Sequence, residues 1–306
     1  MDLSTRYLGF ELEHPIVASA SPLTRDIDGI RQLMDAGAAA IVMASVFEEQ
    51  VTANRGVLDE RLETLRQASK QGDIPIIASL NGETRGGWVS FATQLEEAGA
   101  SAIELDLYRV PSDPNETGQA LEQSYVDILR AVKAKVQVPV AVKLSPYFSS
   151  PGNMAKQLVD AGADGLVLFN RFYEGDIDLE SLLVKPDFRL STPYDIRLPM
   201  MWISLLSGRL DASLAATSGV WTYKEVVKYL MVGADVVMTT SSLLKDGPQH
   251  LRTLVSGLRE WMEDRGFESV DALKGRYAAA HLEYPSAFMR AHYSDILTSD
   301  HKDHSS

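Results

Sequence analysis

Short apolar runs alternate along the chain with longer stretches of helical periodicity. Two kinds of junction introduce the apolar runs. Three runs follow a proline, at positions Pro15, Pro75 and Pro139, and four follow a glycine, at Gly37, Gly99, Gly162 and Gly233. A glycine in such a place is typical of the residue that ends a helix in the left-handed conformation. The two series interleave, which predicts a regular alternation of strands and helices.

We therefore expect eight buried strands, each followed by a helix. The strands are expected at 16–20, 39–45, 76–80, 101–107, 140–144, 164–170, 212–219 and 235–241. The helices are expected at 26–36, 58–70, 86–98, 119–134, 151–161, 193–208, 222–232 and 248–264. Apolar strands that alternate with amphipathic helices are typical of a parallel sheet covered by helices. Eight such units, with no Gly-x-Gly-x-x-Gly after the first strand, favour an α/β protein of the closed TIM (β/α)8 barrel type over an open dinucleotide-binding sheet.

Three segments lie outside this repeat. Residues 3–14 precede the first strand, and their pattern predicts an N-terminal hairpin that closes the barrel floor. Residues 176–192 follow the sixth strand and predict an inserted second hairpin or lid, and a C-terminal helical extension is expected from about Val270. We expect residues 1–298 to form a single domain and the polar tail 299–306 to be disordered.

Composition and charge exclude several classes of protein. The 306 residues carry a net charge of −13, which argues against nucleic acid or an anionic membrane as a partner. The chain has no cysteine, so disulfides, thiolate metal ligands and cysteine nucleophiles are excluded, and we expect no metal site. No apolar stretch is long enough to span a membrane, and the N-terminus lacks a secretion signal. We expect a soluble, cytoplasmic protein that acts on a small molecule.

The carboxyl ends of the strands should carry the chemistry, because the active site of a TIM barrel lies there. The fifth strand ends in one charged residue, Lys143. A neutral amine at this place could form a Schiff base, with Asp106 as a nearby acid, whereas a charged one could stabilise a reduced flavin. Asn81 and Asn170, at the ends of the third and sixth strands, could pair with a planar heterocycle or a carboxylate.

The loops after the seventh and eighth strands are rich in small and hydroxylated residues. These loops, "ATSGVWT" and "TTSSLLKDG", occupy the usual phosphate-binding position of a TIM barrel. The residues expected to bind phosphate are Thr217, Ser218, Gly219, Thr240 and Ser241. The alternative is that the same hydroxyls only cap the helices that begin there.

The order of these features resembles the dihydroorotate dehydrogenase family of FMN-containing TIM barrels, and most closely its dihydroorotate dehydrogenase-like branch. The resemblance rests on "LGFELEHPIVASASPLT" at 8–24, "VKLSPYF" at 142–148, "GLVLFNRF" at 165–172, "ATSGV" at 216–220 and "LLKDGPQHL" at 243–251. It implies an oxidoreductase with FMN as cofactor that oxidises dihydroorotate to orotate in pyrimidine biosynthesis. It also implies that the protein can form a homodimer.

The resemblance assigns roles to residues at matching positions. Ala18 and Ser19 would pack on the flavin, Lys143 would reach its N1 side, and Ser218, Gly219, Thr240 and Ser241 would hold its phosphate. Asn170 would contact the substrate. We expect Asn81, Asp106 and Arg109 to contact the substrate as well.

The chain also departs from the family pattern. Met43 ends the second strand, where the family often has a lysine, and Asp106 stands where the family has an asparagine after the fourth strand. The family's catalytic Cys or Ser is missing from "ELDLYRVPSDP", so we expect a displaced base, Tyr108 or Ser112. The alternatives are an FMN barrel with another substrate, an FMN barrel without catalysis, and a phosphate-binding Schiff-base lyase or aldolase that uses Lys143.

Overall fold

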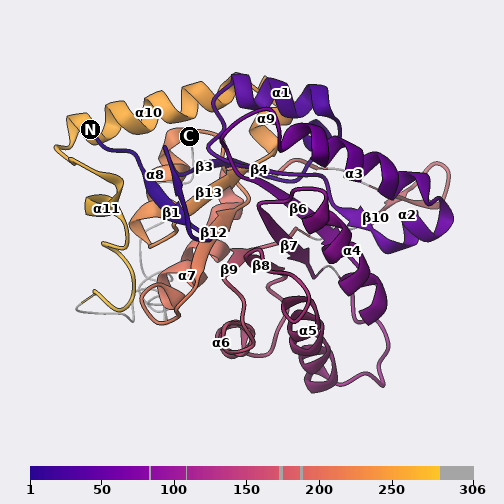
Figure 1. Ribbon diagram of the computed structural model, residues 1–306. Coiled ribbons are helices and arrows are strands. Elements are labelled where there is room, and N and C mark those ends of the chain that lie inside the picture. Colours follow the sequence, from indigo (N-terminus) through magenta and orange to yellow (C-terminus); the bar gives the residue numbers. More distant parts are fainter. Residues whose placement is uncertain (83, 108, 172–174, 187–188, 283–306) are drawn as a thin grey trace.

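The computed structural model shows a barrel of parallel strands surrounded by helices (Figure 1). It describes residues 1–82, 84–107, 109–171, 175–186 and 189–282. Tyr108 and the tail 299–306 therefore lie outside the described residues. None of the helices in the described ranges is both long and apolar enough to cross a membrane.

The barrel is built from strands that run in the same direction and close on themselves. The strands are β3 (Ile16–Ala18), β4 (Ile41–Val42), β5 (Val46–Phe47), β6 (Ile76–Asn81), β7 (Ala102–Asp106), β8 (Val140–Leu144), β9 (Gly165–Leu168), β12 (Ser213–Thr217) and β13 (Val236–Thr239). Closure comes from the pairing of β13 with β3, of β3 with β4 and of β4 with β6. The predicted TIM barrel and the order of its strands are confirmed.

The helices lie outside the strands. They are α1 (Ile27–Asp35), α2 (Glu48–Ala53), α3 (Gly56–Ala68), α4 (Arg85–Glu97), α5 (Gly118–Lys133), α6 (Pro151–Asp160), α7 (Arg197–Leu206), α8 (Tyr223–Met231), α9 (Ser241–Asp246), α10 (His250–Asp264) and α11 (Val270–Leu273), with 3-10 turns η1 (Pro22–Thr24) and η2 (Pro193–Ile196). The four junction glycines all adopt positive φ, between 83° and 108°. A residue with a Cβ is strained in that region, which explains why glycine recurs at these helix ends.

Two apolar layers hold the fold together. A large outer layer joins the strands to the helices, and a smaller inner cluster fills the barrel, with Val17, Ile77, Ala141 and Val167 among its members. Because side chains alternate along a strand, the residues two positions after Ile77 and Ala141 also face inward. Those residues are Ser79 and Lys143, so the top of the barrel interior is polar.

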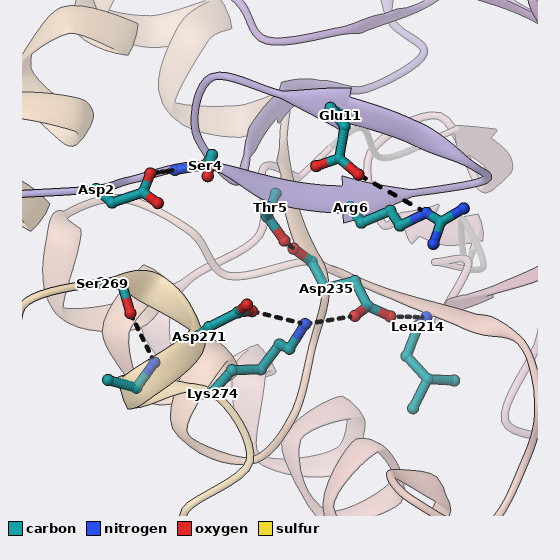
Figure 2. A network of polar contacts seen from close by, with 11 residues as sticks. Asp2, Ser4, Thr5, Arg6, Glu11, Leu214, Asp235, Ser269, Asp271 and Lys274 are labelled. Carbon is teal, nitrogen blue, oxygen red and sulfur yellow. Dashed lines mark hydrogen bonds and ion pairs between the residues drawn. The ribbon is translucent and has the colours of Figure 1, made fainter.

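The N-terminal hairpin closes the floor of the barrel, as predicted. It consists of β1 (Thr5–Tyr7) and β2 (Phe10–Leu12), and Tyr7, Leu8 and Leu12 belong to the inner cluster. Thr5 Oγ1 donates a hydrogen bond of 2.8 Å to the carbonyl oxygen of Asp235, next to β13 (Figure 2). The Asp235 carboxylate accepts from Leu214 N at 2.7 Å and pairs with Lys274 Nζ at 3.2 Å. This network ties the first residues of the chain to the last strands.

A second antiparallel hairpin follows β9, also as predicted. Its strands are β10 (Gly175–Asp178) and β11 (Leu183–Pro186), and the apolar side chains of Ile177, Leu179 and Val184 are exposed. The hairpin returns the chain to residues 189–192, which lie at the mouth of the barrel next to β12 and β13.

Three local predictions differ from the structure. The second strand, expected to be continuous over 39–45, is split into β4 and β5, because Ala44 N leaves the ladder and donates to Thr24 O at 3.2 Å. The helix α2 was not predicted, and neither was α9, which begins inside the predicted phosphate loop. Of the predicted C-terminal helical extension, the described residues contain only the four-residue helix α11.

Candidate active site

Lys143 lies inside the mouth of the barrel. It is the fourth residue of β8, it pairs in register with Asp106 of β7, and it is only 8% exposed. A lysine that merely reached the end of a strand would extend its ammonium group into water. The ammonium of Lys143 is instead held among acidic side chains.

Glu104 is the nearest of these acids. It lies in β7, it is fully buried, and its Oε1 is 3.8 Å from Lys143 Nζ. Ser79 Oγ donates to the same oxygen at 3.3 Å, whereas Oε2 has no hydrogen-bond partner among the described residues. Burial raises the pKa of Glu104, Lys143 acts against that rise, and Asp106 adds to it. Glu104 lies two residues before Asp106 and so faces the same side of the strand, but no motif in the sequence indicated that it belongs to the site.

Asp106 connects the fourth strand to the sixth. Its Oδ1 accepts a hydrogen bond from Asn170 Nδ2, and its carbonyl oxygen accepts one of 2.6 Å from Asn81 Nδ2. Burial raises the pKa of Asp106, and the charge of Lys143 opposes this. Asn170 follows β9 directly after Phe169, whose peptide bond with Leu168 is cis. Four of the predicted site residues, Asn81, Asp106, Lys143 and Asn170, are therefore neighbours at the mouth.

The loop after β12 has an unusual backbone. Ser218 and Gly219 both adopt positive φ, 80° and 74°. The buried hydroxyl of Tyr229 donates to the carbonyl oxygens of Ser218 at 2.9 Å and Thr217 at 3.2 Å. These carbonyls thus turn toward α8, while Gly219 N points to the hydroxyl of Ser191 at 3.1 Å. Successive residues of this kind form a backbone concavity that suits an anion.

Ser191 joins the two loops that were predicted to hold phosphate. Its backbone nitrogen donates to Ser241 Oγ at 3.0 Å, and the two hydroxyl oxygens are 2.8 Å apart. Trp221 Nε1 donates to its carbonyl oxygen at 2.6 Å. Ser191 lies 50 residues before Ser241, so no local pattern in the sequence indicated that it belongs to this site.

A cavity of about 80 Å³ lies between Lys143, Asn170 and the loops after β12 and β13. Its lining includes the predicted residues Ser19, Lys143, Asn170, Thr217, Ser218, Gly219, Thr240 and Ser241, and also Arg171, Arg189 and Ser191. Ala18 is buried in the outer layer instead, so of the Ala-Ser pair only the serine lines the cavity. A larger hollow of about 680 Å³ adjoins it and shares Asn170, Arg171, Arg189 and Ser218.

Two predicted residues lie elsewhere. Arg109 lines a separate cavity of about 730 Å³ beside α5, and its guanidinium pairs with Glu116 at 2.9 Å. Ser112 is exposed on the loop before α5 and does not line the cavity around Lys143. Tyr108, the other predicted base, is outside the described residues.

The donor set of the small cavity fits a flavin mononucleotide. The hydroxyls of Ser191, Thr240 and Ser241 and the nearby arginines suit a phosphate dianion, and the amide of Gly219 orients the Ser191 hydroxyl by donating to it. The ammonium of Lys143 and the amide of Asn170 line the same cavity, and a planar ring with polar edges could meet them there. When bound, FMN would supply the acceptor for a hydride.

Comparison with known proteins shows to which family the chain belongs. The family model described as dihydroorotate dehydrogenase matches residues 52–262 of the chain. The chain belongs to the dihydroorotate dehydrogenase family. As a family member it is a dihydroorotate dehydrogenase-like flavin oxidoreductase.

Individual relatives span most of the chain. It is 27% identical over 301 residues to the catalytic subunit of dihydroorotate dehydrogenase B (NAD(+)) from Thermoplasma acidophilum, which covers 90% of this chain and 98% of the relative. It is 24% identical over 300 residues to the subunit of the same name from Pyrococcus furiosus, with coverages of 90% and 98%. It is also 23% identical over 318 residues to the NAD-dependent dihydropyrimidine dehydrogenase subunit PreA of Escherichia coli, with coverages of 90% and 76%. The relatives of this chain are therefore named for more than one ring substrate.

Proposed function

We propose that this protein uses FMN to oxidise a saturated bond in a pyrimidine-type ring of the dihydroorotate class. The observation that carries the proposal is that a buried lysine and a phosphate-binding cradle lie together at the mouth of the barrel. Lys143 is held beneath the opening by its ion pair with Glu104, and the loops after β12 and β13 form a cradle that suits a phosphate. The names of the relatives support this substrate class, since they act on dihydroorotate or a dihydropyrimidine.

One set of residues binds the phosphate of the cofactor, and another contacts the rings of the cofactor and the substrate. Ser191, Thr240 and Ser241 bind the phosphate through their hydroxyls, and the amide of Gly219, which donates to Ser191 Oγ, orients one of them. Lys143 contributes positive charge next to the ring, where it stabilises the charge that develops on reduction. Asn170, which follows β9 and lines the same cavity as Lys143, orients the substrate ring.

The reaction also requires a group that accepts a proton while the hydride leaves a ring carbon. Loss of a positioned base typically costs about 10²–10⁴ in rate. We assign this task to Tyr108, which directly follows Leu107 at the end of the fourth strand, because Ser112 lies on the exposed loop farther along. Oxidation of dihydroorotate to orotate, the reaction of pyrimidine biosynthesis, is the first to be tested.

The Schiff-base alternative fits these contacts less well. A lysine must be neutral to attack a carbonyl group. The ion pair of Lys143 with the fully buried Glu104 uses the charged ammonium, and Asp106 adds a second carboxylate beside it. The surroundings of Lys143 thus favour an electrostatic role.

Purification in the presence of FMN tests the proposal. We expect a yellow protein with the absorption bands of an oxidised flavin, and we expect these bands to bleach when a ring substrate is added without oxygen. A protein that takes up no FMN would contradict the proposal. A colourless protein that is trapped by borohydride with a carbonyl substrate would support the lyase instead.

A further inference from the structure

Two carboxyl groups share one ammonium group at the substrate end of the mouth. Glu104, Asp106 and Lys143 are 0%, 6% and 8% exposed, and β7 and β8 place them side by side. With Lys143 protonated, the net charge of these three side chains is zero when one carboxyl is ionised and negative when both are ionised. A carboxylate on an incoming substrate would therefore meet no net positive charge here, and burial makes its repulsion from Asp106 stronger than in water.

The amide of Asn170 is oriented by the same carboxylate. Its Nδ2 donates to Asp106 Oδ1, so one of its N–H groups is used inside the protein. The carbonyl oxygen of that amide is an acceptor, and the carboxylate of Asp106 is an acceptor as well. This side of the mouth thus favours a ligand that presents N–H donors.

The groups beside this cluster on β4, β5 and β6 are uncharged among the described residues. Met43 is 2% exposed and packs in the outer layer, and the next polar groups are the hydroxyls of Ser45 and Ser79, which are 2.8 Å apart. Among the described residues that line the cavity, the other cations are Arg171 and Arg189. Arg171 donates to the carbonyl oxygen of Arg189 at 2.8 Å, and Arg189 pairs with Asp176 at 3.8 Å, so both guanidinium groups already have partners within the protein.

We propose that this site selects uncharged cyclic ureides with ring N–H groups, such as dihydrouracil, and that Asp106 disfavours the carboxylate of dihydroorotate. The inference rests on the proposed function and specifies its substrate class. Asp106 acts here as a specificity-determining residue, because its charge and its bond to Asn170 set what the mouth accepts.

Binding of the two oxidised rings to the FMN-loaded protein tests this directly. Uracil and orotate differ only in the carboxylate, and their dissociation constants can be measured from the change that they cause in the flavin spectrum. We expect uracil to bind at least tenfold more tightly than orotate. In Asp106→Asn we expect that ratio to fall by about ten- to a hundredfold, as estimated for a charge pair about 6 Å apart at an effective dielectric of about 20–40.

The control is Asp160→Asn, which removes one negative charge from the exposed surface of α6, where Asp160 pairs with Lys156. It should leave the ratio unchanged. FMN content and thermal stability identify an Asp106→Asn protein that has not folded, and in that case Asp106→Ser takes its place. Equal or tighter binding of orotate by the yellow wild-type protein overturns the inference, and so does an unchanged ratio in the folded Asp106 variant. A protein that takes up no FMN overturns the proposed function itself, before any pyrimidine is added.

Discussion

Replacement of Lys143 by methionine would leave Glu104 and Asp106 in the barrel without their shared partner. Methionine has nearly the same length and fills the same space, so the change removes a charge and leaves little cavity. Removal of one member of a buried ion pair typically costs about 3–5 kcal/mol, because the other charge remains in the interior. Glu104 is fully buried, which places this site at the upper end of the range.

The loss of folding stability caused by Lys143→Met should be greater at high pH than at low pH. Burial raises the pKa of Glu104 in the folded protein, and the loss of Lys143 removes a group that opposes this rise. A carboxyl with a raised folded pKa binds its proton more tightly in the folded state than in the unfolded state. Stability is therefore retained below the unfolded pKa and is lost as the pH rises toward the folded pKa. The loss amounts to about 1.4 kcal/mol for each pH unit in that window.

Urea unfolding at pH 5 and pH 8, followed by circular dichroism, would measure the effect. The comparison is made without added FMN, because a ligand that binds the folded state would contribute its own stabilisation. We expect Lys143→Met to lose more stability relative to wild type at pH 8 than at pH 5. The double variant Lys143→Met/Glu104→Gln should recover part of the loss at pH 8. A loss that is equal at both values, or greater at pH 5, would refute this account of the cluster.

Three further substitutions test the cradle and the base. Gly219→Val should weaken FMN retention by at least tenfold, because φ is +74° and a Cβ would lie 2.8 Å from Thr192 O; full flavin occupancy would count against the cradle. Tyr229→Phe removes the hydrogen bond that holds Ser218 O, and fluorescence titration should show FMN binding that is weaker by about 1 kcal/mol, with unchanged affinity as the contrary result. Tyr108→Phe should slow anaerobic flavin reduction by about 10²–10⁴ without changing FMN affinity, and an unaltered pH profile would show that this tyrosine is not the base.

The repeat of strands and helices could be predicted because its signals are local. A glycine at the end of a helix and a proline before a strand act within a few residues, so Gly37, Gly99, Gly162 and Gly233 indicated the turns. The carboxyl ends of parallel strands meet on one side of the barrel, and this rule alone brought Lys143, Asp106 and Asn170 together correctly. The family resemblance supplied the chemistry.

The rest of the site depends on contacts that the sequence does not encode locally. Glu104 was missed because both faces of a barrel strand are buried, so an apolar run hides which of its residues face inward. Ser191 reaches Ser241 and Gly219 only because the chain returns through the second hairpin. Arg109 lies at a strand end, but its partner Glu116 holds it in a different cavity.

The floor hairpin has a consequence for how the polypeptide matures after synthesis. The hydroxyl of Thr5 binds the carbonyl oxygen of Asp235, which leaves the ribosome 230 residues later. Contacts over such distances in sequence form slowly, since a long loop must close before they contribute. The apolar side chains of the hairpin β1–β2 therefore lack their packing partners until nearly the whole barrel has emerged. A chain that stops before β13 would expose Tyr7, Leu8 and Leu12, which makes it a natural target for chaperones and proteases.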